Sequence, residues 1–380
     1  MNFELTNEQE MARKVFREFA ENVAKPLAAK VDELEMFPIE TVKKMKEVGF
    51  FGIPFPKEYG GANLDNLTYA MAVEELSKVC ATTGVIVSAS TSLCAAPIYE
   101  FGTEEQKQKY LVPLAKGDHI GAFGLTEPNA GTDAAGQKTT AVLVNDEYYL
   151  LNGSKVFITN AGYAQTYIIF AMTDKSKGIR GISAFIVEDS MEGFEVGKKE
   201  LKMGIKGSAT CELILKDVKV PRENMLGREG QGFKIAMNTL DGGRIGIASQ
   251  ALGIAQGAIN ETLKYVKERS QFGRSLAKFQ NTQFKLADMQ TSTDASRLLV
   301  YRAACLKDSK KKYSSEAAMA KLFASETAMN VTNKAVQLFG GYGYMREYPV
   351  ERMMRDAKIT EIYEGTSEVQ RMVISAGMLK

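Results

Sequence analysis

The sequence has very few of the residues on which hydrolytic and metal-dependent enzymes rely. Its 380 residues include one histidine, His119, four cysteines and no tryptophan. A Ser-His-Asp triad or a multi-histidine metal site therefore has little to draw on, and we expect no metal and a structural or solvent-facing His119. The cysteines show neither paired metal spacing nor a disulfide framework, which predicts reduced packing thiols in a reducing compartment.

Several signatures of nucleotide and membrane binding are also missing. The chain has no glycine-rich phosphate loop ending in Lys-Ser or Lys-Thr, and its glycine cluster at 340–343 follows a predicted helix, which argues against a Rossmann turn. A net charge of +2 with interspersed signs offers no broad basic surface for nucleic acid. The start lacks a basic region followed by an apolar stretch, which indicates a cytoplasmic or already trimmed chain. A charge-free stretch inside 78–100 is long enough to span a membrane, but its Ser, Thr and Gly content predicts a buried core helix.

What the sequence does contain is a change of hydrophobic period along its length. A chain of this size exceeds what one core usually supports, so two or three domains are expected. Residues 1–118 have apolar positions three and four apart, which predicts an all-helical domain. Residues 119–226 change to period two with frequent turn pairs, which predicts an antiparallel β-sandwich or barrel. The expected strands are 139–144, 148–151, 167–172, 182–187 and 211–215.

Residues 227–380 are helical again. Four long segments, at 233–268, 279–306, 314–338 and 350–362, fit a four-helix bundle, and 366–378 predicts a terminal helix. The fold class is therefore α+β, with an N-terminal helical domain, a middle antiparallel β domain and a C-terminal four-helix bundle.

Two segments of the predicted β domain have a composition suited to a ligand site. The first, Gly121-Ala-Phe-Gly-Leu-Thr-Glu-Pro-Asn-Ala-Gly-Thr-Asp133, combines glycines, which allow close backbone approach to a flat ligand, with hydroxyls that bond its polar edge. A plain loop is the alternative. The second, Lys155-Val-Phe-Ile-Thr-Asn-Ala-Gly162, places an aromatic and a hydroxyl two residues apart on one strand face. A buried strand end is its alternative explanation.

The third segment, Asp356-Ala-Lys-Ile-Thr-Glu-Ile-Tyr-Glu-Gly-Thr-Ser-Glu368, contains a predicted helix start. Ser367 with Gln370 three residues later is typical of a capping box, so Glu364 lies in the connection before a helix N-terminus. Between Tyr363 and Gly365 its carboxylate is expected to be partly desolvated, which raises the pKa and suits a general base. A merely solvated glutamate is the alternative.

Together the three segments resemble the acyl-CoA dehydrogenase family, and the resemblance covers the entire chain in the same helical, β, helical order. Further matches are Leu240-Asp-Gly-Gly-Arg-Ile245, Glu268-Arg-Ser-Gln-Phe-Gly273 with Gln280, and Gln337-Leu-Phe-Gly-Gly341. The stretches 80–87 and 244–253 are most similar to short-chain, butyryl-type members. The resemblance thus implies an acyl-CoA dehydrogenase fold and an enzyme that oxidises butyryl-CoA or its close neighbours in chain length.

The resemblance also implies a non-covalent FAD, whose flavin ring lies against the β domain and whose ADP half reaches a neighbouring subunit of a homotetramer. The ring would accept hydrogen bonds from Thr126 and Thr159, and Arg269 suits pyrophosphate because its planar guanidinium donates paired hydrogen bonds. The implied cofactor contacts are Phe123, Leu125, Thr126, Thr132, Phe157, Ile158, Thr159, Arg269, Phe272, Gln280, Gln337, Gly340, Gly341, Thr366 and Glu368. The implied substrate contacts are Thr132, Asp241, Arg244 and Gly365.

The family chemistry assigns Glu364 as the base that takes the α-proton while the β-hydrogen leaves as hydride to flavin N5. The thioester carbonyl would be held by the Glu364 N–H and a ribityl hydroxyl. Isovaleryl-type members instead have their glutamate at the position that matches Gly243. Two departures from common family residues are Phe157, which replaces Trp, and Thr132, which replaces Ser.

Electron-transfer flavoprotein is the electron acceptor that the resemblance implies. The same site serves dehydrogenation and the reverse reduction, so the sequence leaves the direction open. The alternatives on the same fold are an acyl-CoA oxidase, a flavin monooxygenase and a non-catalytic, FAD-stabilised assembly subunit. Glu364 argues against the monooxygenase, and Glu364, Arg244 and Thr159 together argue against the assembly subunit.

Overall fold

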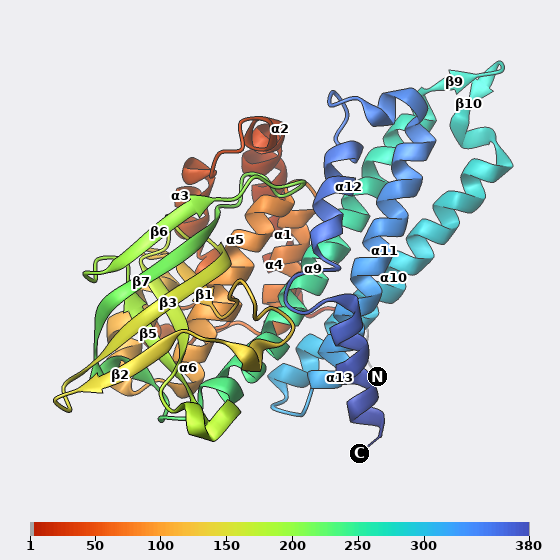
Figure 1. Ribbon diagram of the computed structural model, residues 1–380. Helices are drawn as coiled ribbons and strands as arrows, with labels where there is room; N and C mark the ends of the chain where they lie inside the picture. Colours follow the sequence, from red (N-terminus) through yellow and green to blue (C-terminus); the bar gives the residue numbers. More distant parts are fainter. Residues whose placement is uncertain (1–3, 380) are drawn as a thin grey trace.

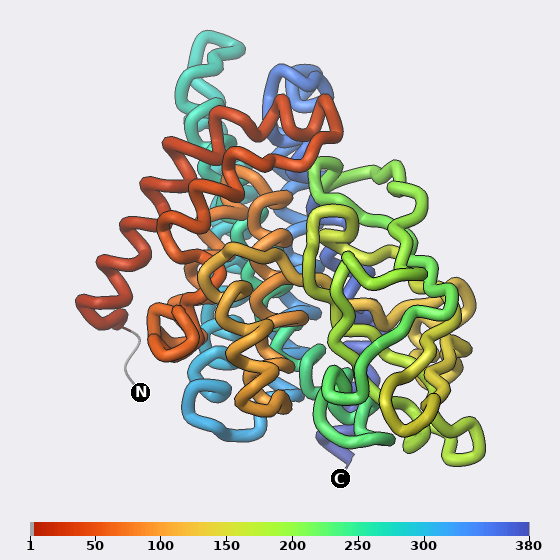
Figure 2. The backbone as a smooth tube through the Cα atoms, turned by 90° about the vertical axis from the view of Figure 1, so that its left-hand side faces the viewer, coloured from red at the N-terminus to blue at the C-terminus, as the bar shows by residue number. Residues whose placement is uncertain are grey.

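The computed structural model describes residues 4–379 and has the helical, β, helical order predicted from the sequence (Figure 1). Seen from the side, the N-terminal helices lie across the front of the molecule and the strands lie beside them (Figure 2). The helical part ends at Lys116, the main sheet extends from Gly121 to Leu226, and helices resume at Gly232. The domain limits at 118 and 226 stay predictions, because the buried clusters described below cross them.

The N-terminal part is made of short helices. Three π-helical turns, at Ala20–Ala24, Ala89–Ala95 and Lys107–Leu111, join several of them end to end. The helices are α1 (Asn7–Phe19), α2 (Lys25–Glu33), α3 (Ile39–Val48), α4 (Asn66–Ser77), α5 (Ala81–Ser88), α6 (Ala96–Phe101), α7 (Glu104–Gln106) and α8 (Val112–Lys116).

The charge-free stretch predicted as a core helix is buried. Residues Ala81–Phe101, which comprise α5, a π-helical turn and α6, have the length and mean hydropathy (1.4) of a membrane span, but residues 81–95 are all buried inside the protein, and the exposed positions, such as Tyr99 at 36%, lie in the last turn. The stretch packs against β1 (Gly121–Gly124) and the long helix α9 (Gly232–Glu268). Its apolar character therefore serves the protein core.

The middle part is a mixed sheet rather than the purely antiparallel one that the sequence predicted. Its strand order is β6-β7-β3-β2-β4-β5-β8, and β1 lies off this path, parallel to β4. Strand β2 also meets β4 in parallel, whereas the other pairs are antiparallel. The strands are β2 (Thr140–Val144), β3 (Tyr148–Thr159), β4 (Thr166–Met172), β5 (Ile182–Glu188), β6 (Phe194–Lys199), β7 (Thr210–Pro221) and β8 (Met225–Leu226).

The sequence-based prediction missed β1 and β6 for identifiable reasons. Strand β1 is Gly-Ala-Phe-Gly, which has no β-branched residue, and β6 has only one buried side chain, Phe194. Strands β3 and β7 are longer than predicted because their pairing continues through register shifts, where strict alternation is lost.

The C-terminal part contains the predicted long helices. They are α9, α10 (Gln280–Asp308), α11 (Ser314–Phe339), α12 (Val350–Ile359) and the terminal α13 (Ser367–Met378). A small hairpin of β9 (Ser270–Gln271) and β10 (Arg274–Ser275), which the sequence did not predict, projects beyond the ends of the helices (Figure 1).

Three clusters of buried apolar side chains hold the parts together. One joins α1, α2 and α3 to the sheet, a second joins α4 and α5 to the C-terminal helices, and a third joins α6 and α8 to β4, β5 and the start of α9. Helix α9 approaches α4 so closely that a Cβ at Gly253 would lie 2.4 Å from the Glu74 carbonyl oxygen. A Cβ at Gly257 would lie 2.1 Å from the carbonyl oxygen of Lys78. The two backbones are therefore in direct contact.

We predict that Gly257→Ala lowers the free energy of unfolding by about 1–3 kcal/mol, because the added methyl meets backbone that must move. Urea or thermal unfolding measures the change. Asn260→Ala, which alters an exposed position on the same helix, should stay within about 0.5 kcal/mol of the parent. Equal stability of the Gly257→Ala variant and the parent would contradict the close contact of the two helices.

Candidate active site

The predicted base, Glu364, lies in the turn between α12 and α13. Glu364 and the following Gly365 both have left-handed backbone conformations, with φ of +53° and +93°. For a glutamate this conformation is uncommon and costs free energy, so the surrounding structure must hold it. Strained backbone of this kind is often found at functional sites.

The helix start after this turn differs from the predicted capping box. Thr366, rather than Ser367, is the N-cap of α13, and its hydroxyl accepts a hydrogen bond from the Val369 N–H at 3.4 Å. The Gln370 side chain turns back and donates to the carbonyl oxygens of Glu364 at 3.2 Å and Gly365 at 2.8 Å. The capping-box prediction was wrong because this glutamine bonds the strained turn instead of the N-cap amide.

The Glu364 carboxylate points into the protein against α9. Its Oε2 atom is buried and has no hydrogen-bond partner among the described residues. A Cβ at Gly243 would lie 2.2 Å from Oε2 and 2.7 Å from the side chain of Leu93. The glutamate position of the isovaleryl-type members and that of this chain therefore converge on the same point in space.

Burial raises the pKa of Glu364 to about 8, although the positive charges of Lys321 and Arg244 oppose the shift. The residue keeps some exposed surface, but its reactive oxygen is enclosed. A carboxylate that loses water without gaining hydrogen bonds holds a proton more tightly and is a stronger base. This is the environment that the sequence predicted for it.

Two hydrogen-bonded pairs of polar side chains lie near the Glu364 carboxylate. The Tyr363 hydroxyl bonds Gln250 Oε1, and the Gln250 amide donates to the Ala81 carbonyl oxygen at 3.0 Å. Tyr69 donates to Ser88 Oγ at 3.3 Å, directly against α9. The two pairs join α4, α5, α9 and the turn that carries Glu364.

The predicted substrate residues Asp241 and Arg244 form an ion pair one turn apart on α9. Asp241 also accepts a hydrogen bond from Ser314 Oγ at 2.9 Å. The Arg244 side chain is buried, and its Nε has no partner among the described residues. A buried donor without an acceptor is costly, so a ligand oxygen at this position is expected. Thr132 is exposed in the loop before β2, and none of its described contacts connects it with the pair.

The residues predicted to face the flavin lie on β1, the following loop and the end of β3. Phe157 is 65% exposed, with φ of +59°, where the pairing of β3 with β7 shifts between Lys155 and Ile158. This bulge interrupts the alternation that was expected to place Phe157 and Thr159 on one face. The hydroxyls of Thr126, Thr132 and Thr159 make no hydrogen bond within residues 4–379, so they are free to bind a ligand. The other members are Phe123, partly buried, and Leu125 and Ile158, both buried.

A buried ion pair holds the loop after β1 against β3. Lys155, with a fully buried side chain, donates to Glu127 at 2.8 Å and to the Leu125 carbonyl oxygen at 3.3 Å. Glu127 in turn accepts hydrogen bonds from the backbone N–H groups of Lys138 and Thr139. The pair therefore fixes both ends of the loop that carries two of the free threonine hydroxyls.

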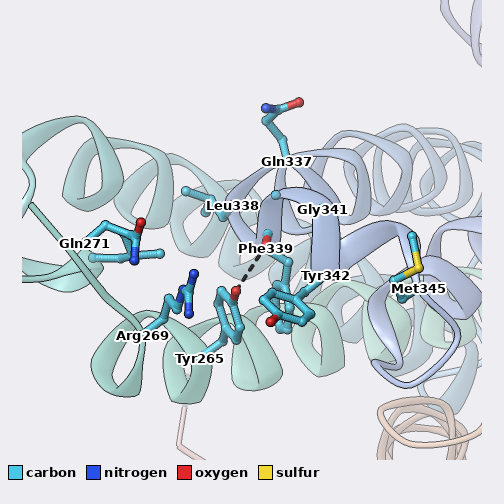
Figure 3. Close-up of a pocket in the computed structure, with 11 residues that line it drawn as sticks. Tyr265, Arg269, Gln271, Gln337, Leu338, Phe339, Gly341, Tyr342 and Met345 are labelled. Carbon is cyan, nitrogen blue, oxygen red and sulfur yellow. Dashed lines mark hydrogen bonds between the residues drawn. The ribbon is translucent and has the colours of Figure 1, made fainter.

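The residues predicted to bind the ADP half lie at the far end of the helical bundle. Arg269, Gln337, Gly340 and Gly341 line a pocket of about 480 Å³ together with Tyr265, Phe339 and Tyr342, among others (Figure 3). The Tyr265 hydroxyl donates to the Phe339 carbonyl oxygen at 3.2 Å, and a Cβ at Gly340 or Gly341 would meet no atom within 4 Å. The open glycine backbone and the arginine suit a pyrophosphate.

Four predicted cofactor residues do not line the pocket, and two of them lie near this end of the bundle. Phe272, 93% exposed, occupies the tip of the β9–β10 hairpin, and Gln280 is the first, exposed residue of α10. Thr366 and Glu368 belong to the start of α13 instead. The described residues that line the pocket come from the end of α9, the hairpin after it, the end of α11 and the turn that follows, and none comes from the β domain. Within one chain the pocket and the free threonine hydroxyls therefore belong to separate regions.

Sequence reasoning missed the contacts that Lys321, Gln370, Gln250 and Tyr69 make around the turn of Glu364, although it had placed Gln370 in a capping box. For Lys321 a signal was available, because it interrupts a run of small residues on one helix face, with Ala317 four positions before and Ala324 three positions after. A charged residue on such a face is buried and therefore calls for a specific role. The other three carry no comparable signal.

Comparison with known proteins agrees with this geometry. The acyl-CoA dehydrogenase N-terminal, middle and C-terminal domains match residues 6–118, 122–218 and 230–379. A short-chain specific acyl-CoA dehydrogenase of Clostridium acetobutylicum is 64% identical over 380 residues, which is all of both chains. The structure of butyryl-CoA dehydrogenase from Megasphaera elsdenii has 55% identity and a TM-score of 0.99 over all of both chains. A chain in a structure described as an electron transferring flavoprotein of Acidaminococcus fermentans has 60% identity, a TM-score of 0.99 and the same full coverage.

The three matched domains together cover nearly the whole chain. The entire fold also superposes on the structure of butyryl-CoA dehydrogenase. This chain belongs to the acyl-CoA dehydrogenase family.

Proposed function

We propose that this chain is a short-chain acyl-CoA dehydrogenase that converts butyryl-CoA to crotonyl-CoA with Glu364 as the general base. The observation that carries the proposal is the buried, unpartnered Oε2 of Glu364 beside Gly243. The short-chain and butyryl-CoA specificities of the similar proteins support the choice of substrate.

The reaction requires removal of a weakly acidic hydrogen next to the thioester carbonyl. Glu364 has the raised pKa that such a base needs, and the left-handed turn directs its carboxylate inward. We propose that the Glu364 N–H donates to the thioester oxygen, where negative charge develops as the α-proton leaves. The partnerless Nε of Arg244, held by Asp241, would bind an oxygen of the CoA portion.

FAD is the cofactor, and the residues present fit it. The free hydroxyls of Thr126, Thr132 and Thr159 would bind the flavin part, and the pocket at Arg269 and 337–341 would bind the ADP part. When bound, FAD accepts the β-hydrogen as a hydride. Because the two sets belong to separate regions of one chain, and because the family resemblance implies an ADP half that reaches a neighbouring subunit, we propose a homo-oligomer, a tetramer by that resemblance, in which each cofactor contacts two subunits.

Glu364→Gln should abolish the chemistry without preventing flavin binding. We expect anaerobic bleaching of the flavin by butyryl-CoA to slow by at least about 10²- to 10⁴-fold, because the amide cannot accept the α-proton. Stopped-flow absorbance of the flavin-loaded protein measures the rate. Glu326→Gln, which loses only an exposed ion pair with Arg371, is the matched control and should bleach like the parent. Equal bleaching by Glu364→Gln and the parent would show that another group is the base.

The pH dependence of the reaction should follow the raised pKa of Glu364, about 8. Only the carboxylate form accepts a proton, so kcat/KM for butyryl-CoA is expected to rise with pH and to level off above about pH 8. The pKa of buried Lys321 is also about 8, so the observed midpoint belongs to the coupled pair. Initial rates from pH 6 to 9.5 test this, and a rate that falls over that range would contradict it.

We further propose electron-transfer flavoprotein as the electron acceptor, with support from the similarity to a chain from such a structure. Turnover of butyryl-CoA in air should then release little hydrogen peroxide, and added electron-transfer flavoprotein should accelerate it at least about 10-fold (an order-of-magnitude expectation for a specific partner). Dye reduction and peroxide assays measure the two outcomes. Rapid peroxide release without the partner would favour an acyl-CoA oxidase instead.

A further inference from the structure

Helix α11 carries a lysine whose side chain is completely buried. Lys321 has 0% exposure and lies on the helix face formed by Ala317, Ala320, Ala324 and Ala328. Its Nζ donates one hydrogen bond, at 2.8 Å, to the carbonyl oxygen of Gly365. A buried ammonium with a single neutral acceptor is costly, so its retention at this position calls for an explanation beyond packing.

The acceptor of that bond belongs to the strained turn of the proposed base. The Gly365 carbonyl oxygen receives a second hydrogen bond, also 2.8 Å long, from Gln370, which bonds the Glu364 carbonyl oxygen as well. Two side chains from different helices thus hold consecutive residues in left-handed conformations. The lysine bonds the turn from α11, and Gln370 bonds it from α13.

The same ammonium is the largest positive influence on the Glu364 carboxylate. Burial raises the pKa of Glu364, and Lys321 opposes this more strongly than Arg244 does. Burial in turn lowers the pKa of Lys321, which Glu364 opposes. No ion pair within 4 Å joins the two side chains in the described part of the chain, so Lys321 acts on the carboxylate through space. The charged and titratable groups that face this pair are Arg244 on α9, Tyr69 on α4, Tyr363 and Glu361 before the turn, and Glu368 on α13.

We propose that Lys321 is a positioning residue for the base: it holds the Gly365 carbonyl, and with it the left-handed turn, and supplies the positive charge that allows Glu364 to ionise in an enclosed site. The inference rests on the proposed role of Glu364. It explains both the single hydrogen bond and the burial of the charge. A neutral side chain of the same length would fill the space but could provide only part of this function.

Two variants separate the hydrogen bond from the charge. Lys321→Gln can keep a donor near Gly365 but loses the charge, and Lys321→Met loses both. In the flavin-loaded protein the midpoint of the pH profile for butyryl-CoA bleaching should move up by about 1 unit or more in both, because an opposite charge is removed. Lys321→Met should also lower the plateau rate at high pH at least about 10-fold (an order-of-magnitude expectation for a misplaced base). Lys334→Met removes a partly exposed charge from the same helix and should leave both quantities unchanged.

Unfolding measurements distinguish this role from a structural one. Removing the buried ammonium relieves its desolvation cost but also removes a hydrogen bond to the turn, so both variants should remain folded with flavin bound while the midpoints of their pH profiles are shifted. An unshifted midpoint in both variants would overturn the proposal, even if the rates fall. Failure of both variants to fold with flavin bound would also overturn it, because Lys321 would then be a requirement of the fold. If instead Glu364→Gln still bleaches, the assignment of the base fails independently of any Lys321 result.

Discussion

Close packing of α9 is the constraint on which the rest of the structure depends. At Gly243, Gly246, Gly253 and Gly257 a Cβ would lie within 2.5 Å of a neighbouring atom. The partners are the Glu364 carboxylate, Ser88 Oγ and two carbonyl oxygens of α4. One helix therefore sets the distance between the N-terminal helices, the C-terminal bundle and the base turn. Glycine in a helix costs about 1 kcal/mol relative to alanine, so its repeated use here indicates that proximity matters more than helix propensity.

This packing determines the chemistry available to Glu364. A carboxylate in contact with solvent would have an ordinary pKa, whereas the space at Gly243 encloses Oε2 and raises the pKa to about 8. The enclosure is costly, and the left-handed turn adds to the cost. Gln370 and Lys321 offset part of it by bonding the two carbonyl groups of the turn. The site thus combines a strained, poorly solvated carboxylate with a rigid frame, as expected where reactivity is favoured over stability.

The cofactor region follows a different principle. Here the chain presents groups without partners: free hydroxyls on the loop before β2 and on β3, an exposed Phe157 and an open pocket at 337–341. The buried Lys155–Glu127 pair keeps the hydroxyl-bearing loop in place without using the groups that would bind a ligand. If each cofactor contacts two subunits, as proposed, a complete site would require their association. Oligomer formation and cofactor binding would then stabilise each other.

The sequence by itself determined the order of helical and β parts, the long helices of the bundle and the segments that carry the ligand groups, since these follow from local periodicity and from short motifs. The neighbours Tyr363 and Gly365 allowed a partly desolvated Glu364 but left a solvated one open, and the family resemblance singled out this residue. Only the tertiary structure decided that Gly243 and Glu364 meet, that Lys321 and Gln370 hold the same carbonyl, and that β1 pairs in parallel with β4. Most of these contacts join residues that are distant in the chain. Gln370 is close to the turn in the sequence, but its side chain could bond either the N-cap amide or the carbonyl oxygens of the turn. Local propensity carries no information about such distances, and only packing of the whole chain fixes them.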